Sequence, residues 1–119
     1  MKPLDRNANV LEHIVNYCDQ IEMTIDRFGS SYEIFAADPI YRNAVALCIL
    51  QIGELVGKLT DEFRAAHPSI PWRQIKAVRN IVAHSYGTVD PETTWEIIVD
   101  DIPRLKAYCV RILNDAGQQ

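Results

Sequence analysis

Long hydrophobic runs are missing from this 119-residue chain. The longest apolar stretch, residues 44–52, is interrupted by Gln51 and is far shorter than the ~20 residues that a membrane-spanning helix needs. The N-terminus runs into an amphipathic pattern that contains Glu12, Asp19 and Glu22, so it lacks the apolar core of a secretory signal. We therefore expect a cytoplasmic protein without a membrane span.

Cysteine is also scarce, and the three present, Cys18, Cys48 and Cys109, lie far apart. An odd number of isolated cysteines, each within an apolar pattern, argues against a disulfide framework and against a zinc cluster. His13 and His67 have no acidic or cysteine cluster at ligand spacing beside them. The sequence predicts buried thiols, no metal site and no cofactor.

Positive charge is in deficit, because 16 acidic residues outnumber 12 Lys and Arg and give a net charge of −4. Proteins that coat nucleic acid rely on many cations to neutralise phosphates, so a broad basic surface is excluded. A small local pocket is still compatible with this charge, built from residues such as Arg73, Lys76 and Arg79. A symmetric dimer would double such a pocket.

Apolar residues recur every three or four positions along most of the chain, and this period predicts helices rather than strands. The first stripe, from Leu11 to Phe28, is one face of a helix that Gly29 closes. A short helical turn is expected next, beginning at residues 30–32.

A second long helix is predicted to begin at Asp38 and Pro39, which provide an N-cap and a first helical residue. Its apolar positions, Leu47 among them, cover a wide face. We expect a central, buried helix that extends to about Ala66.

Two further helices are predicted. The third has an apolar stripe over residues 72–82, and an Asp-Pro pair at residue 90 opens the fourth. Within the fourth, Pro103 lacks the N–H that would bond to the carbonyl of Val99, which predicts a kink or a break. The expected fold is an all-α, up-and-down bundle of four main helices plus a short helical turn, one domain over residues 1–119.

The run from Arg79 to Tyr86 brings a fixed cation, an imidazole and a phenol together near the expected end of the third helix. Arginine directs two donors to phosphate oxygens, and His84, with an unperturbed pKa near ~6.5, can give or take a proton. RNA supplies its own 2′-hydroxyl nucleophile, so proton transfer and charge stabilisation suffice to cleave it without a metal. A helix-capping and packing role is also open, since cations are common at helix C-termini.

The geometry of the motif constrains that hypothesis. Five residues turn an ideal helix through roughly 140°, so Arg79 and His84 do not share one face. Either the helix ends near Ala83 and the chain bends His84 back, or the long side chain of Arg79 reaches around the helix, or the site lies in a groove whose other wall comes from a second subunit. We favour the groove. Glu54, between apolar neighbours, is expected to be buried and to need a cationic partner, either Arg79 or another Arg or Lys at the dimer surface. Asn80 is a candidate to hydrogen-bond RNA or the local backbone.

Four segments in this order and spacing resemble the HEPN-domain family of the HepT type. They are Ile52-Gly53-Glu54, His67 to Trp72, Arg79 to Tyr86, and Val89-Asp90 with Trp95-Glu96. The resemblance covers nearly the whole chain. It implies an HEPN-like fold and the toxin of a type VII-like toxin–antitoxin pair, a homodimeric, metal-independent endoribonuclease.

The same resemblance implies roles for individual residues and a partner. Arg79 and His84 would be catalytic, and a minimal nucleotidyltransferase antitoxin of the MntA type would silence the enzyme by transferring AMP to Tyr86. An alternative is a non-catalytic nucleotide-binding or substrate-docking module that works with a nucleotidyltransferase and uses Arg79 to hold phosphate. A purely structural helical dimer is a further alternative.

Overall fold

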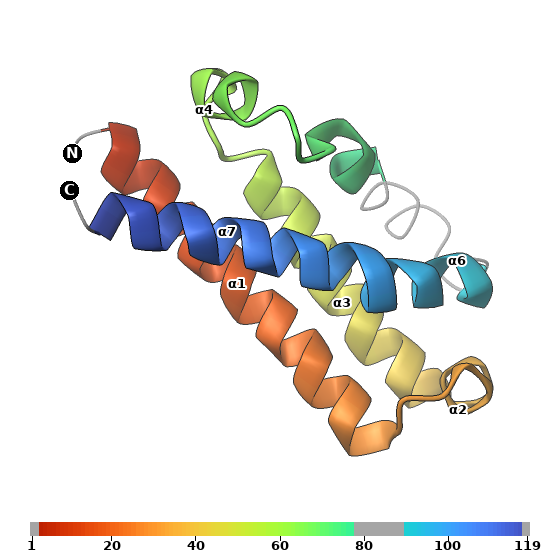
Figure 1. The fold of residues 1–119 in the computed structure, drawn as a ribbon. Coiled ribbons are helices and arrows are strands. Elements are labelled where there is room, and N and C mark those ends of the chain that lie inside the picture. The colour runs from red at the N-terminus through yellow and green to blue at the C-terminus, as the bar shows by residue number, and fades with distance from the viewer. Residues whose placement is uncertain (1–2, 78–89, 118–119) are drawn as a thin grey trace.

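The computed structural model describes residues 3–77 and 90–117, and within them there are helices and short connections but no strand. In chain order these are α1 (Pro3–Phe28), α2 (Tyr32–Ala37), α3 (Pro39–Val56), α4 (Asp61–Ala66), a helix described over residues 72–77, α6 (Pro91–Glu96), the π-helical turn η1 (Ile97–Asp101) and α7 (Ile102–Gly117). Figure 1 shows α1, α3 and α7 as long rods, with α1 packed against both of the others. The predicted all-α, HEPN-like fold is confirmed.

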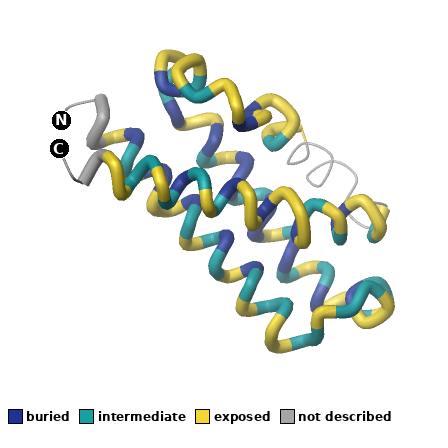
Figure 2. The backbone as a smooth tube through the Cα atoms, in the orientation of Figure 1, coloured by how far each residue is buried: buried dark blue, intermediate teal, exposed yellow. Residues whose placement is uncertain are grey.

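The first helix follows its predicted stripe and ends where the sequence indicates. Buried and exposed positions alternate along this helix (Figure 2), and its buried side chains include Leu11, Ile14 and Ile21. Gly29 has a φ of 120°, a backbone conformation that suits glycine alone among the common residues. A Cβ at this position would also lie 2.9 Å from Cδ1 of Ile34, but this methyl group ends an exposed side chain that can move aside, so the turn into α2 depends on glycine for its backbone conformation.

Both Asp-Pro pairs cap helices as predicted. The Asp38 carboxylate accepts hydrogen bonds from the backbone N–H groups of Ile40, at 2.9 Å, and Tyr41, at 3.4 Å, at the start of α3. Asp90 accepts one from the N–H of Glu92, at 3.2 Å, at the start of α6. These bonds satisfy donors that a helix leaves free in its first turn.

The second long helix is shorter than predicted. It ends at Val56 rather than near Ala66, because Gly57 begins a turn and Thr60 caps a separate helix by accepting a hydrogen bond from the N–H of Phe63. Phe63 is buried after the turn, so the apolar period continues although the helix does not.

A buried polar contact from α1 holds this turn. Asn7 is only 4% exposed; its amide nitrogen donates to Oγ1 of Thr60 at 3.2 Å, and its amide oxygen accepts from the Thr60 N–H at 3.1 Å. Since Thr60 also caps α4, this one pair ties α1 to the connection between α3 and α4.

We expect Asn7→Ala to lower the free energy of unfolding by about 1–3 kcal/mol, because it leaves the backbone N–H of Thr60 without its hydrogen-bond acceptor in a partly buried place. The matched control is Asn9→Ala at an exposed position of α1, which should change stability by less than ~0.5 kcal/mol. Urea denaturation followed by circular dichroism measures both. Equal effects in the two variants would show that the contact does not stabilise the turn.

An aromatic cluster fixes α2 against its neighbours. The ring of Phe35 lies edge-on to Tyr41 at 5.0 Å and 5.4 Å from Trp95, and Phe28 stacks on Tyr41 at 5.1 Å. The Tyr41 hydroxyl donates to the carbonyl of Gly29 at 3.0 Å. The cluster therefore joins the end of α1 to α2, α3 and α6.

The final helix is interrupted just before Pro103, as predicted. In η1 the N–H of Ile102 donates to the carbonyl of Ile97, five residues earlier, instead of four. Pro103 has no N–H, so the carbonyl of Val99 cannot receive its usual α-helical bond. The helix accommodates that loss with one wider turn and continues as α7.

Candidate functional site

The proposed catalytic motif lies outside the described residues. This holds for each of its members, Arg79, Asn80, His84 and Tyr86. Both flanks are described: a helix over residues 72–77 leads into the segment, and Asp90 caps α6 after it.

Two of the cations expected beside Arg79 lie on the leading flank. Arg73 and Lys76 are both exposed. A Cβ added to Gly57 would lie 3.7 Å from Nζ of Lys76, so this ammonium group lies over the C-terminal end of α3, where the helix dipole favours positive charge. The residues immediately before the motif thus carry exposed positive charge.

Glu54 is exposed on α3, which corrects the expectation that its apolar neighbours bury it. Leu47, seven residues earlier, is 57% exposed, although the sequence placed it on the apolar side. Seven residues are nearly two helical turns, so both side chains lie along one solvent-facing strip of α3. The desolvation cost that a buried carboxylate would carry therefore does not apply to Glu54.

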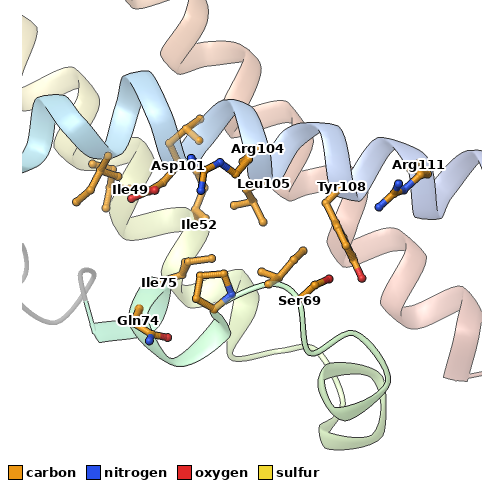
Figure 3. Close-up of a pocket in the computed structure, with 14 residues that line it drawn as sticks. Ile49, Ile52, Ser69, Gln74, Ile75, Asp101, Arg104, Leu105, Tyr108 and Arg111 are labelled. Atoms are coloured by element: carbon orange, nitrogen blue, oxygen red, sulfur yellow. The ribbon is translucent and has the colours of Figure 1, made fainter.

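A groove of about 600 Å³ lies between α3, residues 69–75 and the η1–α7 helix (Figure 3). Its floor is aliphatic, formed by Ile49, Ile52, Ile70, Pro71, Ile75, Ile97, Ile102 and Leu105. Its remaining lining is polar and consists of Ser69, Gln74, Asp101, Arg104, Tyr108 and Arg111. Most of the floor is buried, whereas all of the polar residues except half-buried Tyr108 are exposed. A ligand would therefore meet a polar rim before an apolar floor.

One wall of the groove is a row of side chains on α7. Arg104, Tyr108 and Arg111 are spaced by four and three residues, which places them along one helix face. Tyr108 points toward the segment that carries Ser69, and its hydroxyl lies 3.2 Å from Nδ1 of His67 (Figure 3). The guanidinium carbon of Arg111 is 5.3 Å from the Tyr108 ring centre, a cation–π contact.

The two arginines of this wall are available to an anion. Ion pairs between described residues join Asp61 to Arg64, and Asp19 and Glu22 to Lys106, and none of these pairs involves Arg104 or Arg111. The sequence alone does not predict this groove. The three-and-four spacing marks a polar face of the last helix, but only the tertiary structure shows what that face borders.

All three cysteines are free and buried, as predicted. Burial raises the pKa of Cys18 and of Cys109 from 9.0 to about 12, and it raises the pKa of Cys48 as well, because an apolar site disfavours the thiolate. Burial and a raised pKa both lower the reactivity of these thiols in the folded state.

We expect iodoacetamide at pH 8 to leave the folded protein unlabelled and to label all three thiols in urea, as counted by intact mass. Because the folded-state pKa values of Cys18 and Cys109 exceed the unfolded value of 9.0, the stability they contribute is complete below pH 9 and falls as the pH rises toward 12. Rapid labelling of the folded protein would contradict this burial.

Within residues 3–77 and 90–117, no three His, Cys, Asp or Glu side chains are grouped to hold a metal ion. In the same ranges, no helix has the length and apolar character needed to cross a bilayer.

An all-helical, HEPN-like bundle is the class that these features define. Residues 14–112 match the family described as Ribonuclease HepT-like, and the chain belongs to that family. The matched range spans the Arg79–Tyr86 motif.

The chain aligns with individual relatives over most of the length of both. The chain is 38% identical over 105 residues to a "Putative RNase" of Caldanaerobacter subterraneus subsp. tengcongensis, which covers 87% of this chain and 91% of the relative. It is 35% identical over 97 residues to a "Probable ribonuclease HepT" of Thermococcus cleftensis, with coverages of 80% and 87%. It is 33% identical over 110 residues to a "Putative RNase" of Methanocaldococcus jannaschii, with 92% of each chain covered. No solved structure gives a significant match.

Proposed function

We propose that this chain is a metal-independent endoribonuclease in which Arg79 and His84 are the catalytic residues. The observation that carries the proposal is the match to the HepT-like ribonuclease family over residues 14–112, a continuous range that includes both residues. Relatives that carry ribonuclease names and align over most of both chains support RNA as the substrate.

The proposed reaction uses the 2′-hydroxyl of RNA as the nucleophile. His84 accepts the proton of that hydroxyl as its oxygen attacks the adjacent phosphorus, and the resulting imidazolium gives the proton to the departing 5′-oxygen. Arg79 stabilises the negative charge that accumulates on the phosphorane oxygens. The P–O bond to the 5′-oxygen breaks, which leaves a 2′,3′-cyclic phosphate and a 5′-hydroxyl.

Within the same proposal, the chain is a cytoplasmic, single-domain toxin of a type VII-like toxin–antitoxin pair and works as a homodimer. An MntA-like nucleotidyltransferase silences it by attaching AMP to Tyr86. The added bulk covers the site, and the added negative charge repels the RNA phosphate. Asn80 supports the site by hydrogen bonding. Glu54, on the exposed strip of α3, is a second supporting residue of the site.

Cleavage of end-labelled RNA in the presence of EDTA tests the proposal. We expect cuts that leave cyclic phosphate and 5′-hydroxyl ends, after the intact mass has shown that no AMP is attached to the protein. Ends that carry a 5′-phosphate, or an absolute requirement for Mg²⁺, would overturn the mechanism. If intact RNA is recovered although the protein binds nucleotide or a nucleotidyltransferase, the docking-module alternative is favoured.

A further inference from the structure

We propose that the groove between α3, residues 69–75 and α7 binds single-stranded RNA, with Arg104 and Arg111 holding its phosphates. This inference rests on the proposed function for its substrate. It extends that function by assigning an RNA-contacting surface, built from described residues, outside the Arg79–Tyr86 motif.

The charges on the groove wall point to a polyanion. Arg104 and Arg111 are exposed and form no ion pair with any described carboxylate, whereas Lys106, two residues from Arg104, bonds to Asp19 at 2.8 Å and Glu22 at 3.0 Å. Unpaired guanidinium groups hold phosphate oxygens with forked hydrogen bonds. Seven residues of α7 correspond to a rise of about 10.5 Å, which phosphates about two nucleotides apart in an extended strand can match.

The remaining rim residues suit the other parts of a nucleotide. Ser69 and Gln74, on the wall opposite α7, are exposed and can exchange hydrogen bonds with a 2′-hydroxyl or a base edge (Figure 3). Asp101 repels phosphate but accepts hydrogen bonds from base amino groups. Its position at the η1 end of the row confines the phosphates to the stretch between Arg104 and Arg111.

The geometry of η1 supports a site at this place. Ile97 and Asp101, the first and last residues of the π-helical turn, both line the groove. Single π-helical turns within α-helices occur frequently at functional sites, where they alter which side chains face a ligand.

The distribution of exposed hydrophobic side chains argues against a protein partner in the groove. The core of a protein interface is apolar and poor in charge. The large hydrophobic residues that the described structure exposes are Met23, Ile34, Ile40, Leu47 and Val99, and none of them lines the groove. The rim of the groove instead carries Asp101, Arg104 and Arg111, and these charges favour RNA over the apolar face of an amphipathic helix.

The test is the affinity for a fluorescent single-stranded RNA oligonucleotide, measured by anisotropy in a His84→Ala background so that binding is read without cleavage. The variant is Arg104→Gln with Arg111→Gln, which keeps most of each aliphatic stem. The matched control is Arg6→Gln with Arg27→Gln, two exposed arginines of α1, which changes the net charge equally. Circular dichroism checks folding, and the corresponding alanine pair serves as a second variant.

We expect the groove variant to weaken binding about tenfold and the control less than about twofold. The slope of log affinity against log salt should become shallower by about 1.4, since each phosphate contact on a single strand contributes ~0.7. With His84 intact, KM should rise about tenfold while kcat stays within about twofold.

Several outcomes would overturn the inference. These are equal weakening in the control, a loss of kcat without a change in affinity, and unchanged RNA affinity together with loss of a dimer in light scattering, which would assign the groove to a protein contact. If the wild type cleaves no RNA but the groove variant still binds RNA more weakly than the control, the proposed function fails and the groove assignment stands.

Discussion

His84→Ala should lower the rate of RNA cleavage by about 10²–10⁴-fold, to near background, without unfolding the protein. A single positioned histidine that moves protons in the transition state typically contributes that factor. Alanine removes both ring nitrogens and with them the group that would transfer the proton. The measurement is the initial rate of cleavage of end-labelled RNA in EDTA, with far-ultraviolet circular dichroism to confirm helical content.

His13→Ala is the matched control for this prediction. His13 is exposed on α1, so the same chemical change there should leave the rate within about twofold. If His84→Ala cleaves as fast as the control, His84 has no catalytic role. A large loss of melting temperature in His84→Ala would instead support the packing role.

Arg79 completes the same argument. Arg79→Ala should reduce cleavage comparably, because the charge on the phosphorane then has no fixed counter-charge. Arg79→Lys keeps the charge but loses the planar fork, so its rate should fall between those of the alanine variant and the wild type. Full activity in both variants would exclude Arg79 from the chemistry, and Arg27→Ala on the exposed face of α1 controls for charge alone.

Local sequence signals predicted helix ends well in this chain. Gly29, Asp38 and Asp90 each act through their own backbone or side chain on the next few residues, so their effect does not depend on distant packing. The same holds for Pro103, whose missing N–H is a property of one residue and whose consequence is the adjacent π-helical turn.

The end of α3 was not predictable from periodicity. Leu59 and Phe63 keep the apolar spacing across the turn because both are buried, even though the backbone between them is not helical. The stop comes from Gly57 and from Thr60, whose partner Asn7 lies more than fifty residues away in the chain. The apolar period of neighbouring residues carries no information about that long-range contact.

The sequence pattern also does not predict which face of α3 is buried. Its apolar residues surround so much of the helix that the pattern indicates no single buried side, so periodicity alone does not show that Leu47 and Glu54 face solvent. The groove was missed for a related reason, since Arg104 and Arg111 become a site only where residues 69–75 and α3 approach α7. The proposed catalytic motif, in contrast, is contiguous in the sequence, so it can be recognised without the tertiary structure.

Phe35→Ala should be among the most destabilising substitutions in the described structure. Phe35 is 1% exposed and contacts Tyr41 and Trp95, so alanine would leave a cavity where α2, α3 and α6 meet. Removing a buried phenylalanine side chain typically costs about 3–5 kcal/mol, the sum of lost apolar transfer and the cavity that remains. For a domain of this size, the melting temperature should fall by about 10 °C or more.

Met23→Ala on α1 is the matched control for that loss, because Met23 is 58% exposed and should cost less than about 1 kcal/mol. Phe35→Leu, which refills much of the volume, should recover a large part of the stability. Thermal unfolding followed by circular dichroism separates the three variants. If Phe35→Ala has the same melting temperature as Met23→Ala, the aromatic cluster does not hold α6 in place. The groove end formed by Ile97, the residue that follows α6, would then need another support.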